Sequence, residues 1–291
     1  MKPLYAYAVV LAAFAACSAP PKETATETAA APELKAPTLT MKWETEPTLT
    51  TCESVLYDKA NDVLYVADIA GDPSGVDGVG FVSKVGLDGK VIDAQWVKGL
   101  NAPKGMGLAN GKLYVADINT IVEIDPSNGK VTNKYAVEGA QFLNDITTDN
   151  SGKVFVSDSN TGTVSVLENG KITTFLSGQK GPNGLLSDGS DFLMASFAEG
   201  TLNRVDGGQV VLIADSVENA DGIEAVGDGG WLVSSWNGKV TYVGADGRTK
   251  VILNTTADSV SAADIEYIPE KKLLLVPTFF KNKVVAYELG N

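Results

Sequence analysis

Residues 64–69 read LYVADI, and the same six letters return at residues 113–118. The starts of successive runs of this kind are 49, 41, 38, 39 and 43 residues apart, with turn residues and short alternating stretches between them. The four later runs are 154–159 (VFVSDS), 192–197 (FLMASF), 231–236 (WLVSSW) and 274–279 (LLVPTF). Several short strands repeated about every 40 residues are typical of propeller blades. The repeats predict an all-β, six-bladed β-propeller over residues 39–291.

The last repeat ends one strand short, after residues 283–289 (KVVAYEL). Residues 39–45 (LTMKWET) have the alternation of a strand and could supply the missing one. We therefore predict that this N-terminal strand closes the ring, which removes an open sheet edge. The alternative is that residues 39–45 extend the preceding segment.

Residues 1–16 contain an apolar run from Leu4 to Ala16, which has the length of a signal-peptide core and is too short for a stable membrane span. The ending Phe14-Ala15-Ala16-Cys17 resembles a bacterial lipobox, which implies Sec-dependent export and lipidation of Cys17. Ser18 does not resemble an inner-membrane retention signal. We expect a lipid-anchored protein of the bacterial envelope, at the outer membrane or facing the periplasm; the alternative is an ordinary signal peptide cleaved near Ala16.

Residues 17–38 are rich in Ala, Pro, Thr and Glu without an apolar period, which predicts a flexible tether. If Cys17 carries lipid, Cys52 is the one remaining cysteine, and no intrachain disulfide can form. The predicted organisation is therefore a signal peptide (1–16), a tether (17–38) and a propeller (39–291), expected to be monomeric and to contact a membrane through the lipid alone.

The composition excludes several chemistries. The 291 residues carry 23 Lys and Arg against 36 Asp and Glu, a net charge of −13, and no histidine. The acidic balance argues against a nucleic-acid partner. Without imidazole, catalytic triads, histidine zinc sites and histidine proton shuttles are excluded. Catalysis would depend on carboxylates, amides, hydroxyls, Lys or Arg, or a cation bound by oxygen.

A second series of residues lies 9 to 11 positions before each recurring run. Similar contexts surround most of them, such as Pro-Lys-Gly, Pro-Asn-Gly and Ala-Asp-Gly. A polar residue at one place in every blade is expected to face the central channel near one mouth, although simple entry turns would also explain the Asn-Gly and Asp-Gly pairs. The series is Glu53, Lys104, Asn144, Asn183, Asp221 and Asp264.

Such a ring contains three carboxylates, two amides and one ammonium group. Buried carboxylates are costly to charge unless a cation balances them. Carboxylate and amide oxygens favour one hard divalent ion, Ca²⁺ first, with Mg²⁺ or Mn²⁺ as substitutes. The alternative is an internal salt bridge, in which Lys104 neutralises Glu53 and no metal binds.

Four segments resemble the gluconolactonase/senescence-marker-protein (regucalcin-like) family of six-bladed propellers, over roughly residues 50–290. They are CESVLYDKANDVLYVADI (52–69), FLNDITTDNSGKVFVSD (142–158), GPNGLLSD (181–188) and ADGIEAVGDGGWLVSSWNGKV (220–240). The resemblance implies that Glu53, Asn183 and Asp221 bind a metal, and that Asn144 binds metal or substrate.

The resemblance also implies a reaction, hydrolysis of a lactone or ester by a metal-dependent enzyme acting on a small molecule. Asp221 would position or deprotonate water, Lys104 would steady the oxyanion or steer an anionic substrate, and Asp264 would contact substrate or support the ligands. Sugar-lactone members carry an arginine where this chain has Phe142, which weakens the expectation of a sugar substrate. A phosphotriester-type hydrolase is a weaker option.

A non-catalytic alternative stays open. Motifs of the P-(N/D)-G kind also occur in structural propeller repeats of the NHL type, and propellers of one fold serve as enzymes or as binding platforms. Lys104 and Phe142 favour this alternative, a propeller scaffold that binds a ligand or a protein partner.

Overall fold

The computed structural model describes residues 1, 3–4, 8, 33–189 and 191–290. The chain divides into two units, Met1–Glu33 and Leu34–Asn291, and every strand belongs to the second. Cys17, the tether up to residue 32 and most of the predicted signal peptide (1–16) lie outside the described residues. A search of the described part of the chain finds no helix that is long and apolar enough to cross a membrane.

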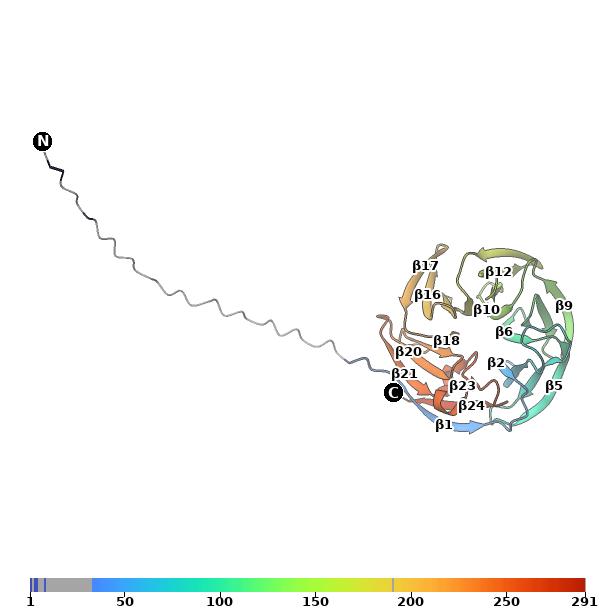
Figure 1. Cartoon of the computed structure of the whole chain (residues 1–291). Helices are drawn as coiled ribbons and strands as arrows, with labels where there is room; N and C mark the ends of the chain where they lie inside the picture. Colours follow the sequence, from blue (N-terminus) through green and yellow to red (C-terminus); the bar gives the residue numbers. More distant parts are fainter. Residues whose placement is uncertain (2, 5–7, 9–32, 190, 291) are drawn as a thin grey trace. The chain divides into compact units, whose positions relative to one another are not determined.

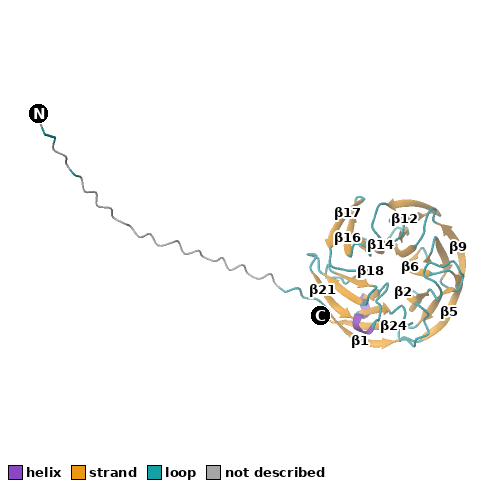
Figure 2. Cartoon of the chain, in the orientation of Figure 1, coloured by secondary structure: helices purple, strands orange, loops and turns teal. Residues whose placement is uncertain are grey.

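The second unit is a six-bladed β-propeller, as the repeats predict. Six sheets of four strands surround a central axis, and neighbouring strands within each sheet are antiparallel (Figures 1 and 2). In five blades the chain runs from the axis outward. Around the axis the innermost strands are β2 (Cys52–Asp58), β6 (Pro103–Ala109), β10 (Leu143–Thr148), β14 (Pro182–Ser187), β18 (Ala220–Ala225) and β22 (Glu266–Ile268).

The recurring apolar runs form the second strand of each blade. These strands are buried along their whole length except for the first residue in two of them, because each lies between two neighbouring blades. A strand covered on both faces has a continuous apolar run rather than an alternating one. The second strands are β3 (Val63–Asp68), β7 (Lys112–Asp117), β11 (Val154–Asp158), β15 (Phe192–Ser196), β19 (Trp231–Ser235) and β23 (Leu273–Pro277).

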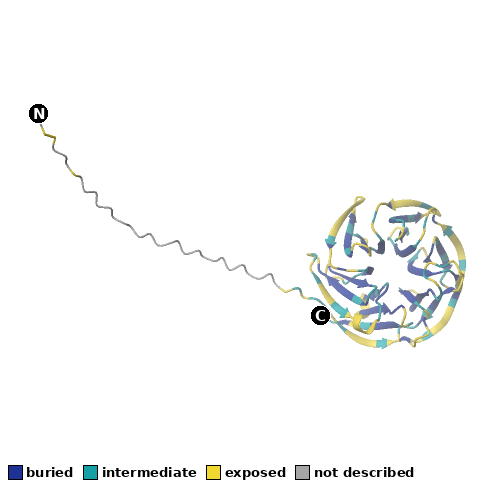
Figure 3. Ribbon diagram, viewed as in Figure 1, coloured by how far each residue is buried: buried dark blue, intermediate teal, exposed yellow. Residues whose placement is uncertain are grey.

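The outer half of each blade is progressively more exposed (Figure 3). Two short 3-10 turns, η1 (Thr256–Asp258) and η2 (Pro269–Lys271), flank β22. The third strands are β4 (Gly80–Val85), β8 (Thr120–Asp125), β12 (Thr163–Glu168), β16 (Thr201–Asp206), β20 (Lys239–Val243) and β24 (Val284–Gly290). The outermost strands are β5 (Val91–Leu100), β9 (Lys130–Ala136), β13 (Lys171–Leu176), β17 (Gln209–Ala214), β21 (Thr249–Asn254) and, for blade 6, β1 (Thr38–Glu44).

Strand β1 closes the ring, which confirms the prediction. It pairs antiparallel with β24, from Thr38 opposite Gly290 to Glu44 opposite Val285. The sheet of blade 6 therefore joins the two ends of the propeller in the order β1-β24-β23-β22. Just before β1, Leu34 and Ala36 pack against the apolar core between blades 5 and 6.

The core consists of apolar layers between adjacent blades. Between blades 1 and 2, for example, Ala67 and Val82 pack with Met106 and Val115. Each fully buried side chain of this size contributes about 1.5–3 kcal/mol relative to exposure. Because these layers surround the axis on every side, they hold the innermost strands, and the side chains near the axis, in fixed positions.

Candidate functional site

Five of the six polar residues singled out in the sequence occupy the same place in their blades. Glu53, Lys104, Asn144, Asn183 and Asp221 are each the second residue of an innermost strand. In each of these blades the pairing with the second strand shifts register at this point. A bulge of this kind bends the strand and re-aims the side chain. The repeated bulge explains how side chains from five blades reach one site near the axis.

These five side chains line a single cavity of about 450 Å³, which we call the mouth cavity. None of the five is more than 8% exposed. The loop between β3 and β4 contributes Pro73 to the cavity. The mouth cavity therefore combines a ring of buried polar groups with part of a surface loop.

Blade 6 differs from the other five, because Asp264 does not line the mouth cavity. Gly105 and Gly222 each follow the ring residue of their blade by one position, and each lies against an aspartate of the next blade. A Cβ atom at Gly105 would lie 2.3 Å from Asp145 Oδ1, and one at Gly222 would lie 2.3 Å from Asp264 Oδ1. Asp264 is therefore equivalent to Asp145, which follows the ring residue Asn144 by one position. The sixth ring position belongs to Ala263, which is buried in an apolar cluster.

Two ring oxygens lack a partner. Glu53 Oε2 and Asn183 Oδ1 are buried and accept no hydrogen bond from the described residues. Buried polar atoms are otherwise nearly always paired, so each unpaired one calls for a ligand or a role. The Asn183 side chain hydrogen-bonds to Asp221, which leaves its carbonyl oxygen unpaired.

Electrostatics in the ring oppose two free negative charges. Burial raises the pKa of Glu53 well above its usual range, and the Asp221 carboxylate raises it further, while Lys104 lowers it. Burial raises the pKa of Asp221 to about 8; Asp145 adds to this effect and the hydrogen bond from Asn183 counteracts it. Asp221 therefore keeps its proton near neutral pH, and burial beside the Asp221 carboxylate disfavours the ionised form of Glu53.

The residues present fit a hard divalent cation. Two carboxylates and two amides line the mouth cavity, and the unpaired Glu53 Oε2 and Asn183 Oδ1 are acceptors of the kind that Ca²⁺ prefers. Within the described residues no three or more Cys, Asp and Glu side chains form a metal-binding group. A cation in this cavity would therefore depend on the oxygens of Asn144 and Asn183 to complete its ligand set.

Lys104 makes contacts that neither sequence alternative anticipated. Its Nζ atom donates hydrogen bonds to the carbonyl oxygens of Pro73, at 2.9 Å, and Ala102, at 3.0 Å. The same ammonium group lies 4.3 Å from the centre of the Phe142 ring. Burial lowers the pKa of Lys104, and the carboxylates of Glu53 and Asp117 raise it. Lys104 thus ties the β3–β4 loop to the ring while remaining close enough to Glu53 to influence its charge.

Asn144 is held by Ser159, which directly follows the second strand of the same blade. Its Nδ2 atom donates to Ser159 Oγ at 3.1 Å, and Ser159 Oγ donates to the carbonyl oxygen of Pro182 at 2.8 Å. This relay occupies the nitrogen side of the amide, so the carbonyl oxygen is the atom available to a ligand. Ser159 itself lines the mouth cavity and was not singled out in the sequence.

The rest of the cavity wall is largely apolar. Trp236, Phe279 and Phe280 form a cluster with ring centroids 4.7 to 5.9 Å apart. Phe142 and Phe197 line other parts of the wall. Trp236 follows the second strand of blade 5, and Phe279 and Phe280 follow the second strand of blade 6. The cavity therefore has a polar side and an aromatic side.

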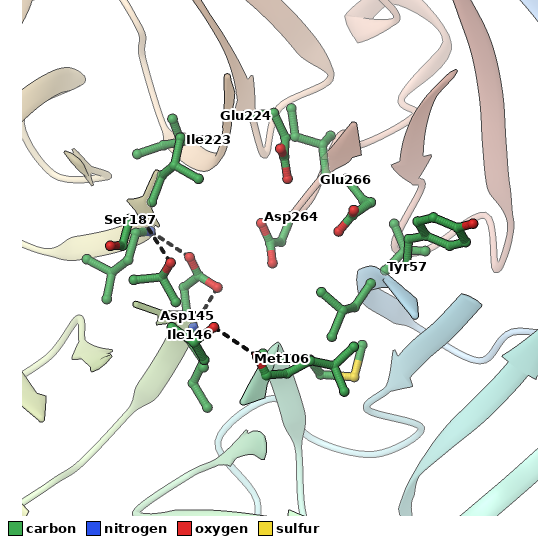
Figure 4. A pocket seen from close by; sticks show the side chains of 18 residues that line it. Tyr57, Met106, Asp145, Ile146, Ser187, Ile223, Glu224, Asp264 and Glu266 are labelled. Atoms are coloured by element: carbon green, nitrogen blue, oxygen red, sulfur yellow. Dashed lines mark hydrogen bonds between the residues drawn. The ribbon is translucent and has the colours of Figure 1, made fainter. Parts of the chain in front are cut away.

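Asp264 belongs to a second cavity farther along the innermost strands, of about 260 Å³, which we call the channel cavity. Figure 4 shows Asp145, Glu224, Asp264 and Glu266 around it. Burial raises the pKa of Asp145 to about 7 and that of Glu266 to about 8. Burial and the neighbouring carboxylates also hold the pKa values of Glu224 and Asp264 well above their usual range. The raised pKa values favour the protonated forms of all four acids, and Glu266 is largely protonated at pH 7.

The channel cavity was not anticipated from the sequence, although a signal for it exists. Residues 144–146 read NDI and residues 263–265 read ADI, so the shared Asp-Ile pair aligns Asp264 with Asp145. Asp145 accepts hydrogen bonds from the backbone of Ile146 and Leu185, both at 2.6 Å, and so links blades 3 and 4. Its neighbour Gly105 has no room for a Cβ atom, which explains a glycine there.

No family model matches the sequence, and no curated protein matches it either. Similar solved structures include a candidate gluconolactonase, with a TM-score of 0.66 and 15% identity over 87% of this chain and 92% of that one. A virginiamycin B lyase from Staphylococcus aureus has a TM-score of 0.63 and 13% identity over 86% and 99%, respectively. A streptogramin B lyase has a TM-score of 0.59 and 11% identity over 85% and 98%. At these identities the likeness establishes a shared six-bladed fold.

Proposed function

We propose that the mouth cavity binds one divalent cation, Ca²⁺ in the first place and Mg²⁺ or Mn²⁺ as substitutes, through Glu53, Asn144, Asn183 and Asp221. The observation that carries this proposal is the pair of buried, unpaired oxygens, Glu53 Oε2 and Asn183 Oδ1, beside a second buried acid. A cation would remove the cost of charging Glu53 and Asp221 together.

We further propose that the protein hydrolyses a lactone or an ester at this site. A bound divalent cation would act as a Lewis acid on the carbonyl group. Asp221 holds a proton near neutral pH and becomes a proton acceptor only when a positive charge nearby lowers its pKa. Asp221 would then position a water molecule and accept its proton, while Asn144 orients the substrate and the Lys104 ammonium offsets negative charge in the cavity.

A covalent route through a thiol does not fit. Cys52 is next to Glu53 in the sequence, but its side chain packs in the core between blades 6 and 1. Burial raises the pKa of the Cys52 thiol to about 12, and its Sγ atom donates to the carbonyl oxygen of Lys283 at 3.1 Å. With no histidine in the chain to activate a nucleophile, direct attack by water is the route that the cavity supports.

The first test is cation binding by the full chain without its signal peptide. We expect isothermal titration with CaCl₂ to show one site, and the melting temperature to rise with Ca²⁺ and fall back with a chelator. Glu53→Gln should weaken binding strongly, whereas Asp206→Asn, which removes an exposed acid on β16, should not. Absence of any divalent binding by the wild-type protein would refute the proposal.

The second test separates an enzyme from a scaffold. The cation-loaded protein is given a panel of lactones and aryl esters, with Asp221→Asn as the variant expected to lose turnover. Running the reaction in ¹⁸O-labelled water distinguishes hydrolysis, which places one labelled oxygen in the product, from elimination of the kind that lyases perform. A product without label would exclude hydrolysis.

The alternative function is a non-catalytic propeller that binds a ligand or a protein partner, and one observation favours it. Lys104 places a positive charge in the ring, where it competes with a metal ion for the acids. Under this alternative, the wild-type protein does not bind Ca²⁺, whereas Lys104→Met does. Wild-type binding with turnover would exclude it.

We also propose that the protein is exported and anchored in the bacterial envelope through a lipid on Cys17. Its support is the sequence at residues 14–17 followed by a long polar segment. In cells, the wild-type protein should fractionate with membranes and incorporate labelled palmitate, and Cys17→Ser should do neither. An unlabelled protein that is released after cleavage near Ala16 would contradict lipidation.

A further inference from the structure

The polar ring side chains at the mouth cavity come from five blades, and of its described residues the sixth blade contributes only Phe279 and Phe280. At the sixth ring position Ala263 packs with Ile69 and Phe279 in an apolar cluster, and Trp236 lies against it. No oxygen from this position reaches the cavity. The ring is thus open on one side, and aromatic side chains occupy that side.

The aromatic side has a defined geometry. The rings of Trp236 and Phe279 are 5.6 Å apart at 73°, and those of Phe279 and Phe280 are 4.7 Å apart at 84°. Edge-to-face contacts of this kind add about 0.5–1.5 kcal/mol beyond burial. In these contacts the edge of one ring points at the face of the next, so the three side chains hold one another in place and form one continuous apolar surface.

Phe279 is held in this surface at a conformational cost. Its backbone φ is 50°, in the left-handed region that a bulky side chain rarely adopts. Its place is fixed by an isolated bridge to Cys52 and by a hydrogen bond from the amide of Asn282 to its carbonyl oxygen, at 3.0 Å. Strain of about 1–3 kcal/mol at such a residue is found most often at functional sites.

Phe280 is 63% exposed although it lines the cavity. A large apolar side chain at the rim of a cavity gains more from covering a ligand than from facing water. Phe142, which also lines the cavity, lies 4.3 Å from the Lys104 ammonium and offers a ligand no hydrogen-bonding group. The polar side chains that can face a carbonyl group are therefore those of the ring residues and of Ser159 and Asn160.

We propose that the ester or lactone accepted by this cavity carries an aromatic or branched apolar group, which packs against Trp236, Phe279 and Phe280 while its carbonyl group faces Glu53, Asn183 and Asp221. This inference rests on the proposed hydrolase function. It excludes hydroxyl-rich sugar lactones as preferred substrates, because the aromatic side would leave their hydroxyl groups without partners.

The test uses two compounds whose binding is measured without any reaction and two whose hydrolysis is measured. Acetanilide, the amide counterpart of phenyl acetate, and gluconamide are titrated into the Ca²⁺-loaded protein. Phenyl acetate and glucono-δ-lactone are assayed as substrates. We expect acetanilide to bind and gluconamide not to, and phenyl acetate to have the higher kcat/KM.

The informative variant is Phe280→Ala, with Leu212→Ala as the matched control, because Leu212 on β17 is also largely exposed and does not line the cavity. Phe280→Ala should weaken acetanilide binding about tenfold and raise KM for phenyl acetate similarly, with kcat within about twofold. Leu212→Ala should change neither.

The outcomes separate this inference from the proposed function. Turnover of glucono-δ-lactone in preference to phenyl acetate, or equal behaviour of the two variants, would overturn the apolar specificity and leave a hydrolase. Binding of acetanilide that depends on Phe280, without turnover of any panel member, would support the apolar ligand and refute the hydrolase.

Discussion

Glu266 is the residue whose replacement gives the clearest pH signature, because it titrates far from its ordinary range and lies outside the mouth cavity. Burial raises its pKa from 4.5 to about 8, with a further contribution from Glu270, while a hydrogen bond from the backbone of Tyr57 opposes the shift. Between these two values the folded protein binds more protons at Glu266 than the unfolded chain does. Stability therefore falls as the pH rises through this window.

The size of the effect follows from the shift. Each pH unit within the window removes about 1.4 kcal/mol. Between pH 5 and pH 8 the ionisable side chain therefore costs roughly 4 kcal/mol of unfolding free energy. Glu266→Gln keeps the size of the side chain and an oxygen that can accept from Tyr57, but cannot ionise. The variant should equal the wild type near pH 4.5 and be more stable at pH 8.

Urea unfolding of both proteins, measured with a chelator present at half-unit steps from pH 4.5 to pH 8.5, gives the difference directly. Asp145, Glu224 and Asp264 contribute the same direction of slope to both proteins. Because the charge of Glu266 also raises the pKa of Glu224, the difference between the two curves measures Glu266 together with its interaction with Glu224. Asp206→Asn is the control, since Asp206 is an exposed acid on β16 and is not among the groups that shift the pKa of Glu266. Parallel curves for the wild type and Glu266→Gln would refute the electrostatic account of the channel cavity.

Three further changes test other parts of the site. Glu53→Gln should lower Ca²⁺ affinity by more than about tenfold in calorimetry while raising stability in chelator, because a buried unpaired acid is removed; unchanged affinity would exclude Glu53 as a ligand. Lys104→Met should tighten Ca²⁺ binding, and weaker binding would contradict this account. The variant should also lose about 2 kcal/mol of unfolding free energy, because the carbonyl oxygens of Pro73 and Ala102 lose a charged donor. Backbone hydrogen exchange should then be faster in the β3–β4 loop. Gly105→Ala should lose roughly 3 kcal/mol in urea unfolding, because its Cβ atom would collide with the neighbouring blade; a neutral effect would show that the blades can separate there.

The fold could be predicted from the sequence because its signal is repeated and local. LYVADI occurs twice and four variants follow at a period near one blade, and strands buried on both faces must be continuously apolar. Closure by β1 was predictable for a similar reason, since one blade lacked a strand and residues 39–45 alternated. No long-range information was needed for either inference.

The site was predictable only in part. Counting back from each recurring run brought Glu53, Lys104, Asn144, Asn183 and Asp221 together, but the count assumed the same bulge in every blade. In blade 6 the innermost strand begins at Glu266, two residues after Asp264, so the count was one residue out of register. The partners of Lys104 could not be counted at all, because Pro73 lies in a loop whose path is set by tertiary contacts.

The register of blade 6 also explains the difference between the two cavities. Because Asp264 stands one residue beyond the ring position, its carboxylate faces the channel cavity with Asp145, Glu224 and Glu266, and it is withdrawn from the mouth. Ala263 takes its place, and the apolar cluster with Phe279 can then extend to the cavity wall. A sixth polar side chain at the mouth would have added a ligand and removed the aromatic side. The single shift of register therefore accounts both for the four ligands of the proposed cation site and for the apolar side of the mouth cavity.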